Sequence, residues 1–575
     1  MKRDIVSGVV CALAGLFIAV IPHIQGLILF GTADFLADGD DVLYLAISRA
    51  PYYGSATLVD PFEPLSTKPT LYPWLSYVPG ARIAAALDVP LLQLSFLWRI
   101  VGGLAMGGSL FVLFRTLFHA LPQRRLLATA AALFVLADPG VIGRPFIALG
   151  LMTQSLVQNN IAGLTQQQHG LYRVTTPLLV LPVLILLIAI LIRPLNLART
   201  LLAAALLALL IYLYFFLWTA AVATLTAFAG CYFLLGLLRR EERRGHWQQA
   251  MWISLVVVIG VALGAPQILS NSQSFADPAL KLALDRMSRG VFIPAGDPIR
   301  TMYLKNVWAW GALFAGTLGF ALLKTRGVGL LWLLTLMGFA LRNSALVTGL
   351  EFENYHWNYV HSPSAELLLV TMAILLLDRL RFWNHRRSVV LLVLSLAAVV
   401  LAITAHWQRC RSATEARFYR QTLSDLAELR PALNRLNEQS LLAGPKAANV
   451  ALLFTRGGQL YQFDQTSHSS LTPDREVHER YVLNAWLSGR VTEPDEPKER
   501  FQVSLLKRPE WEWPAVDRQR QTIRDELQRD GGQALLQRYP VTHLLTAAGD
   551  PAPISGGPWT LVAQGQQWSL WQHGK

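Results

Sequence analysis

Long, unbroken runs of apolar residues fill most of the first 405 positions of the chain, and polar residues gather between them. The runs are about 17–27 residues long, the length that a helix needs to cross a bilayer. Lipid gives the backbone no hydrogen-bond partner, so only helices and closed barrels span it, and barrel strands would alternate apolar and polar residues. The pattern predicts about eleven transmembrane helices, near 5–30, 92–118, 125–147, 177–193, 198–216, 218–238, 250–269, 304–323, 327–342, 363–379 and 387–405.

The positions of the basic residues fit this prediction. Lys and Arg gather in the cytoplasmic loops of membrane proteins. With the N-terminus in the cytoplasm, every short basic cluster lies on that side: Arg124 and Arg125, Arg193 and Arg199, Arg239 to Arg244, Lys324 and Arg326, and Arg379 to Arg387. The stretch 198–238 is too long for one crossing, so we divide it near Leu217 and Trp218. The outer side then carries the loops 31–91, 140–176, 270–303 and 343–362.

The pattern changes after about residue 405, where Arg, Glu, Gln and Pro become frequent. We therefore divide the chain into a membrane domain, 1–405, and an outer soluble α/β domain, 406–575. Within the second domain the pattern predicts helices at 409–440 and 517–532, the latter closed by two glycines. It predicts strands at 447–455, 541–547 and 560–571.

Composition supports a membrane protein. The chain is 53% hydrophobic and only 15% charged, whereas soluble proteins carry about 25% charged residues. The net charge of +13 is explained by cytoplasmic Lys and Arg, so we expect no nucleic-acid partner. The three cysteines form no disulfide framework or zinc spacing. No nucleotide-binding glycine loop or serine-nucleophile motif is found.

The first outer loop concentrates acidic residues. Asp34, Asp38, Asp40 and Asp41 lie within eight positions, and such crowding requires a proton, a cation or a positively charged ligand group to offset the repulsion. A sugar-transfer enzyme needs a carboxylate that can accept a proton from an acceptor hydroxyl. One Asp beside another binds protons more readily, which suits a base. A solvated acidic loop or a surface calcium site would also fit the cluster taken alone.

The residues around this cluster carry a family resemblance. DDVLY at 40–44, DPF at 60–62 and KPTLYPWL at 68–75 resemble the first outer loop of GT-C lipid-linked-sugar glycosyltransferases, in the branch of aminoarabinose transferases and protein O-mannosyltransferases. In that family an Asp-Glu pair precedes an aromatic residue and a Lys-Pro-Pro-Leu element. Here Asp41 replaces the Glu and Thr70 replaces a Pro. The resemblance implies a GT-C fold and inverting transfer, with Asp40 as general base, Asp41 as its partner, Tyr44 as the aromatic and Lys68 near the lipid phosphate.

Two further outer loops offer ligand-binding groups. The loop 140–176 is rich in Asn and Gln, which suit sugar hydroxyls, and it ends with His169 and Arg173, of which Arg173 could hold a phosphate. The loop 270–303 collects cations, including Arg289 and Arg300, that would neutralise a lipid phosphate. Interfacial anchoring of Arg173 and solvated cations facing lipid headgroups are the structural alternatives.

The loop 343–362 mixes carboxylates, amides and aromatic rings. Glu353, Asn354, His356 and Trp357 form a typical sugar-binding combination, in which rings pack on the apolar face of a pyranose. An interfacial aromatic belt explains the rings but not the carboxylates. A divalent metal is a further possibility, with candidate ligands Asp38, Asp41, Glu353 and His356, although no tight ligand spacing is present.

These features lead to one main hypothesis and two alternatives. The main hypothesis is a glycosyltransferase of the bacterial inner membrane that uses a polyprenyl-phosphate sugar. The sequence identifies no cofactor beyond the possible divalent metal. The acceptor would be a glycan, a lipid or a protein. A flippase for a lipid-linked glycan is one alternative, but it would place charges near the middle of its spans. The predicted spans are nearly free of charge away from their ends, and Arg99, the main exception, lies near the start of its span. An oligosaccharide or polymer ligase on a similar scaffold is the other.

Overall fold

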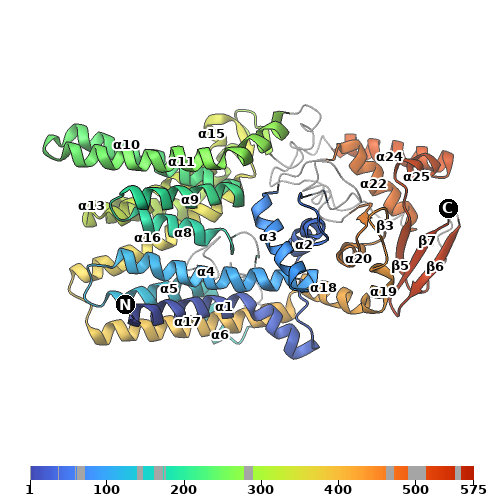
Figure 1. The fold of residues 1–575 in the computed structure, drawn as a ribbon, viewed down its shortest axis with the longest axis horizontal. Coiled ribbons are helices and arrows are strands. Elements are labelled where there is room, and N and C mark those ends of the chain that lie inside the picture. The colour runs from blue at the N-terminus through green and yellow to red at the C-terminus, as the bar shows by residue number, and fades with distance from the viewer. Residues whose placement is uncertain are drawn as a thin grey trace.

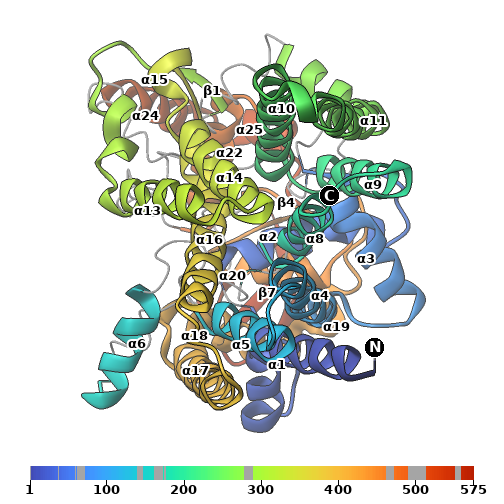
Figure 2. The ribbon, with the colours of Figure 1, turned by 90° about the vertical axis from the view of Figure 1, so that its left-hand side faces the viewer.

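Most of the described residues before Ala413 are helical. The computed structural model describes residues 2–36, 38–58, 60, 72–138, 147–160, 173, 177–276, 289–461, 472–489, 513–550 and 558–574. Each predicted span contains a helix: α1 (Lys2–Phe30), α4 (Leu94–Leu117), α5 (Arg124–Ala137), α8 (Leu181–Leu191), α9 (Leu197–Leu213), α10 (Phe215–Leu238), α11 (Arg243–Ala276), α13 (Val307–Leu323), α14 (Arg326–Arg342), α16 (Asn358–Arg379) and α17 (His385–Ser412). These helices form one bundle, seen from the side in Figure 1 and end-on in Figure 2.

Six helices among the described residues are long and apolar enough to cross a membrane. They correspond to α1, α4, α10, α11, α16 and α17, while α8, α9 and α13 are shorter apolar helices. The chain is thus an α-helical integral membrane protein, and the count of eleven crossings remains a prediction. The division within 198–238 lies at Tyr214, which is extended (φ −164°, ψ 123°) between α9 and α10. The predicted position near Leu217 is three residues too late. Neither Gly nor Pro marks the break in the sequence, so the pattern does not locate it to the residue.

Short polar residues start several of these helices. Asn196, Asn306, Thr325 and Asn384 each accept a hydrogen bond from the backbone N–H three residues later, at the first turns of α9, α13, α14 and α17. Such caps satisfy N–H groups that have no partner within the helix. The connections between the spans therefore end where the sequence supplies a capping side chain.

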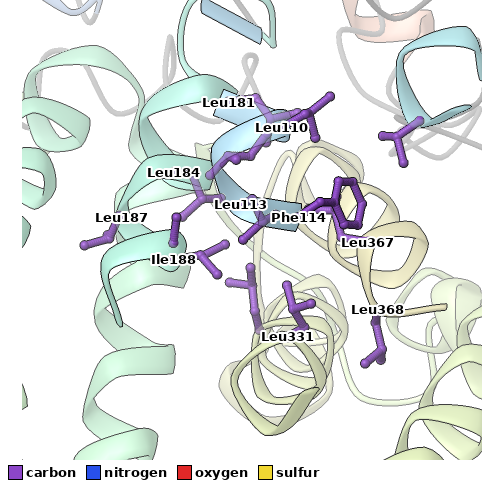
Figure 3. Close-up of a cluster of buried hydrophobic side chains, with 14 of the residues drawn as sticks. Leu110, Leu113, Phe114, Leu181, Leu184, Leu187, Ile188, Leu331, Leu367 and Leu368 are labelled. Carbon is purple, nitrogen blue, oxygen red and sulfur yellow. The ribbon is translucent and has the colours of Figure 1, made fainter. Parts of the chain in front are cut away.

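Packing inside the bundle is dominated by leucine. Figure 3 shows Leu113 and Phe114 of α4 with Leu184 and Ile188 of α8, and beyond them Leu331 of α14. These side chains are almost completely buried. α4 packs against α1, α5 and α8.

The C-terminal region forms a five-stranded sheet in the order β4-β3-β5-β7-β6. The strands are β3 (Leu441–Ala443), β4 (Gly458–Gln459), β5 (His543–Ala547), β6 (Trp559–Gln564) and β7 (Trp568–His573). β3 pairs in parallel with β4 and β5, and β7 is antiparallel to β5 and β6. Helices accompany it: α18 (Thr414–Asp425), α19 (Arg430–Leu433), α20 (Ala447–Ala451), α22 (Asp474–Leu487), α24 (Trp513–Asp530) and α25 (Gln533–Arg538). The predicted small α/β domain is confirmed.

Three local predictions in this domain need correction. The segment 447–455 is helical rather than a strand: α20 is followed by a 3-10 turn at Leu452–Phe454. A short apolar run has too little periodicity to distinguish strand from helix, and its alanines favour a helix. The segment 560–571 is a hairpin of two strands, turned at Gly565. The helix predicted at 409–440 is divided, since α17 continues to Ser412 and extended Ala413 separates it from α18. The strand at 541–547 and the helix before Gly531 are confirmed.

Two elements of the first outer loop lie between the bundle and the sheet domain. They are α2 (Gly39–Tyr52) and α3 (Trp74–Ala86), in blue at the centre of Figure 1. Val42, Leu45 and Ile47 of α2 share one buried cluster with Leu429 and Leu545 of the C-terminal region. α2 is therefore part of the buried core where the helical bundle meets the C-terminal region.

Two distant outer loops meet in a small antiparallel ribbon. β1 (Arg289–Phe292) pairs with β2 (Leu350–Phe352). The 3-10 turn η6 (Pro298–Lys305) follows the first strand and η7 (Asn354–Trp357) follows the second. The ribbon fixes the loop 343–362 at the N-terminal end of α16.

Candidate active site

The acidic cluster lies at the first turn of α2. Asp38 is the N-cap, and its carboxylate accepts a hydrogen bond from the backbone N–H of Asp41 (3.1 Å). Asp40 and Asp41 follow in the first turn. The partial positive charge at a helix N-terminus stabilises carboxylates there. The local sequence thus sets up both the helix start and a concentration of negative charge.

Arginines from three separate parts of the chain pair with three of the acids. Arg99 pairs with Asp41, Arg173 with Asp40 and Arg430 with Asp34. They come from α4, from the second outer loop and from α19. These pairs supply positive charge around the acidic cluster.

Arg99 holds Asp41 in a closed environment. Its Nη2 lies 3.0 Å from Asp41 Oδ2, and the two side chains are 0% and 3% exposed. Its Nη1 lies 3.1 Å from His23 Nε2, and His23 Nδ1 lies 2.6 Å from the carbonyl oxygen of Ala33. A buried pair is maintained only where such further hydrogen bonds satisfy both groups. Asp41 is consequently a structural partner within the site and is shielded from any acceptor.

Asp40 remains reachable. Its side chain is 33% exposed, and its Oδ2 accepts a hydrogen bond from Arg173 Nη2. Arg173 Nη1 donates to the hydroxyl of Tyr359 at the start of α16, and the guanidinium also lies 5.8 Å from the centre of that ring. One arginine therefore connects three outer segments around Asp40.

Asp38 forms no close ion pair with an arginine among the described residues, although the charge of Arg173 acts to lower its pKa. Burial, and then the neighbouring charges of Asp40 and Asp41, raise the pKa of Asp38 to about 8. Asp38 therefore binds a proton more readily than an ordinary aspartate.

Aromatic rings surround the Arg173 contact; we call Tyr44, Tyr214, His356 and Tyr359 the aromatic wall. Tyr214 lies 6.2 Å from Tyr359, edge to face, and His356 stacks on Tyr359 with centroids 5.6 Å apart. Burial, and after it the charge of Asp40, raise the pKa of Tyr44 well above its usual value. Rings of this kind bind the apolar face of a sugar, and the hydroxyls remain available for hydrogen bonds.

The loop 343–362 contributes one polar pair to this region. Glu353 Oε2 lies 3.4 Å from His356 Nδ1, and Glu353 has a left-handed backbone (φ 52°). Glu351, behind it, accepts a hydrogen bond from the backbone N–H of Asn354 (2.6 Å), and burial raises its pKa to about 7. Trp357 donates to the Asn354 side chain (3.3 Å), and both are buried. These contacts hold Asn354 and Trp357 in the interior of the loop.

The remaining predicted site residues lie elsewhere or outside the description. Arg300 donates to the carbonyl oxygen of Ile293 (2.7 Å) and stacks on Phe292. Of Arg289 only the backbone, in β1, is described, and Lys68 and His169 fall outside the described residues.

The metal candidates do not assemble into a binding site. No group of three or more His, Cys, Asp or Glu side chains suited to a metal occurs in the part of the chain that the structure describes. Asp41 is committed to Arg99, and Glu353 with His356 offers only two ligands.

Sequence reasoning missed three contributors to the site: Arg99, Arg430 and Tyr214. Arg99 stands out as a charge within an apolar run, but the sequence gives it no role. Arg430 carries no local signal, because it lies 396 residues from Asp34. Tyr214 also belonged to an apolar aromatic stretch that is typical of an interfacial belt. An isolated charge in a span was the one available clue, since such charges require a partner.

Known structures share this fold. ArnT from Cupriavidus metallidurans in the apo state superimposes with a TM-score of 0.51 at 12% identity, covering 99% of this chain and 97% of that chain. The same protein bound to undecaprenyl phosphate gives 0.48 at the same identity and coverage. The apo oligosaccharyltransferase of Archaeoglobus fulgidus gives 0.47 at 11% identity, covering 95% and 69%. No protein-family model and no curated protein matches the sequence. ArnT is an aminoarabinose transferase with the GT-C fold, and the predicted GT-C fold is confirmed.

Proposed function

We propose that this protein is a membrane glycosyltransferase that moves a sugar from a polyprenyl-phosphate donor to a hydroxyl acceptor, with Asp40 as general base. The observation that carries the proposal is the contrast between two adjacent carboxylates. Asp41 is enclosed by Arg99, whereas Asp40 is one-third exposed beside Arg173 and the aromatic wall. ArnT, which shares the fold, has been crystallised with undecaprenyl phosphate.

The proposed step is a single displacement at the anomeric carbon. The acceptor oxygen bonds to this carbon while its proton passes to the Asp40 carboxylate. The bond from the anomeric carbon to the phosphate oxygen breaks, and the lipid phosphate leaves with the electron pair. One displacement inverts the configuration at that carbon. No nucleotide is needed, because the phosphate is the leaving group.

Arg173 supports recognition of the donor phosphate. Its two terminal nitrogens are used by Asp40 and Tyr359, but its buried Nε–H has no partner among the described residues. A guanidinium can therefore orient the base and offer a further donor to an anion. We expect Lys68 to assist at the phosphate, as the family resemblance implies.

The test is release of free polyprenyl phosphate by the purified full-length protein in lipid nanodiscs. The donors are a panel of polyprenyl-phosphate monosaccharides and one lipid-linked oligosaccharide, with cell-envelope extract as acceptor and with or without EDTA. Asp40→Asn should lower release at least a hundredfold, because general-base catalysis contributes about 10²–10⁴-fold. Asp4→Asn is the matched control, since Asp4 pairs with Arg115 in the membrane bundle.

Each result has a clear meaning. Release that depends on Asp40 supports the proposal and identifies the donor sugar. Turnover of the oligosaccharide donor alone would indicate the ligase. Release that Asp40→Asn leaves unchanged would exclude Asp40 as the base, and Glu353 would be tested next.

One observation favours the flippase alternative. Glu366 lies within α16, is 0% exposed, and neither carboxylate oxygen has a hydrogen-bond partner among the described residues. Charges inside membrane spans often mark transport pathways. If proteoliposomes flip a lipid-linked glycan without releasing polyprenyl phosphate, and Glu366→Gln abolishes flipping, the flippase replaces the transferase.

A further inference from the structure

The helix that carries Asp40 also carries an arginine on its opposite side. Arg49 follows Asp40 by nine residues, and at 100° per residue nine residues amount to a half-turn beyond two full turns. Asp40 contacts Arg173 in the membrane region, whereas Arg49 contacts the C-terminal region. α2 thus connects the two regions through opposite faces.

Arg49 is buried against backbone carbonyls rather than paired with an acid. It is 6% exposed, its Nη1 donates to the carbonyl oxygen of Leu452 (3.4 Å), and its Nη2 donates to that of Gly457. Burial lowers the pKa of Arg49 to about 10, and no carboxylate pairs with it among the described residues. An apolar side chain would fill this space at lower cost. What the guanidinium adds is two directed hydrogen bonds, which fix the rotation of α2 about its axis.

The carbonyl groups that accept the hydrogen bonds of Arg49 belong to a rigid turn at residues 452–457. The Thr455 hydroxyl lies within hydrogen-bond distance of the Leu452 and Gly457 carbonyl oxygens (3.3 and 3.4 Å). The backbone N–H of Arg456 donates to Leu436 (3.1 Å). Gly457 packs so closely that an added Cβ would overlap the carbonyl oxygen of Ser440. Contacts within the C-terminal region therefore hold these carbonyls in place, independently of α2.

Contacts on either side of α2 reinforce this attachment. Beyond its C-terminal end, the Arg456 guanidinium lies 5.0 Å from the ring centre of Tyr53. Before its N-terminal end, Arg430 pairs with Asp34 at 2.9 Å. The C-terminal region consequently holds the acidic helix at both ends.

We propose that Arg49 is a positioning residue, through which the turn at 452–457 of the C-terminal region sets the orientation of Asp40. The inference rests on the proposed role of Asp40 as general base. It gives the C-terminal region a part in the transfer step that is separate from any binding of acceptor.

The test combines kinetics with amide hydrogen exchange in the full-length protein in nanodiscs. Arg49→Met removes the two hydrogen bonds but keeps most of the volume, and Arg49→Lys keeps a donor. Gly457→Ala displaces the turn without altering any side chain of α2. Arg435→Met is the matched control, because Arg435 is exposed on the same region.

We expect Arg49→Met and Gly457→Ala to lower kcat about 10–100-fold, since small displacements of catalytic groups have effects of that size. The KM for the donor should stay within twofold, and amides of residues 42–52 should exchange faster. Arg49→Lys should recover part of kcat, and the control should match the unaltered protein.

Two outcomes would overturn the inference. Unchanged exchange of α2 in both Arg49→Met and Gly457→Ala would show that the turn does not hold the helix. Faster exchange with an unchanged kcat would show that the attachment does not affect the chemistry. If the unaltered protein transfers no sugar from any donor, the proposed function fails, and the exchange rates alone still decide whether the attachment exists.

Discussion

Asp38, Asp40 and Asp41 have identical side chains within four residues, but their surroundings give them different properties. Asp41 is closed in by Arg99, Asp40 is partly exposed beside Arg173, and Asp38 caps the helix without an arginine. The sequence predicts that such a cluster needs compensating charge. It does not predict which arginine reaches which acid, because the partners are 58 and 133 residues away.

Asp38 leads to a prediction about pH. Its pKa in the folded protein is about 8, whereas an unfolded Asp has a pKa of about 3.9. A group whose pKa is raised by folding contributes stability that is complete below about pH 4 and is lost as the pH rises through 8. Asp38→Asn keeps a good N-cap but cannot ionise. We expect this variant to have a higher midpoint of thermal unfolding at pH 7–9 than the unaltered protein.

The measurement is thermal unfolding of both proteins in nanodiscs between pH 4 and pH 9. The difference in midpoint should grow across this range and level off above pH 8. A constant difference would mean that Asp38 does not titrate in this window. Asp34→Asn serves as a control, since Asp34 pairs with Arg430.

At the scale of elements, glycines allow α1 and α4 to pack closely. An added Cβ at Gly107 would overlap the backbone carbonyl of Cys11, and one at Gly103 would approach Gly15. Small residues at helix contacts are typical of membrane proteins, because they let backbones approach. This contact matters for the site, since α1 carries His23 and α4 carries Arg99.

Adjacent glycines provide a matched pair of variants. Gly107→Ala should lower the free energy of unfolding by about 1–3 kcal/mol, because overpacked contacts cost that much. Gly108→Ala should have no such effect, as nothing lies within 4 Å of its added Cβ. Thermal unfolding in nanodiscs compares the two. Equal stability of both variants would mean that α1 and α4 can separate without cost.

At the scale of the whole molecule, the bundle has two distinct ends. The connection between α10 and α11 lies at the end away from the C-terminal domain, whereas α2 and α3 lie beside that domain (Figure 1). The positive-inside rule assigns the first end to the cytoplasm. The predicted orientation therefore requires residues 241 and 438 to lie on opposite sides of the membrane.

Labelling of single cysteines tests this orientation. In a Cys231→Ser background, Glu438→Cys should react with a membrane-impermeant maleimide in intact cells or spheroplasts. Glu241→Cys should react only after the membrane is opened. Both positions are exposed in the structure. Labelling of both residues from the same side would contradict an odd number of crossings between them and the predicted topology.

The sequence by itself determined the class of fold, the approximate spans and the place of the acidic cluster. Apolar run length, the distribution of Lys and Arg, and capping residues are local signals that survive without tertiary contacts. Only the tertiary structure decided the break at Tyr214 and the three arginine partners of Asp34, Asp40 and Asp41. The arginine partners lie far from the acids in the chain, and burial and packing decide which arginine meets which acid. The local sequence shows only that an isolated charge such as Arg99 needs a partner.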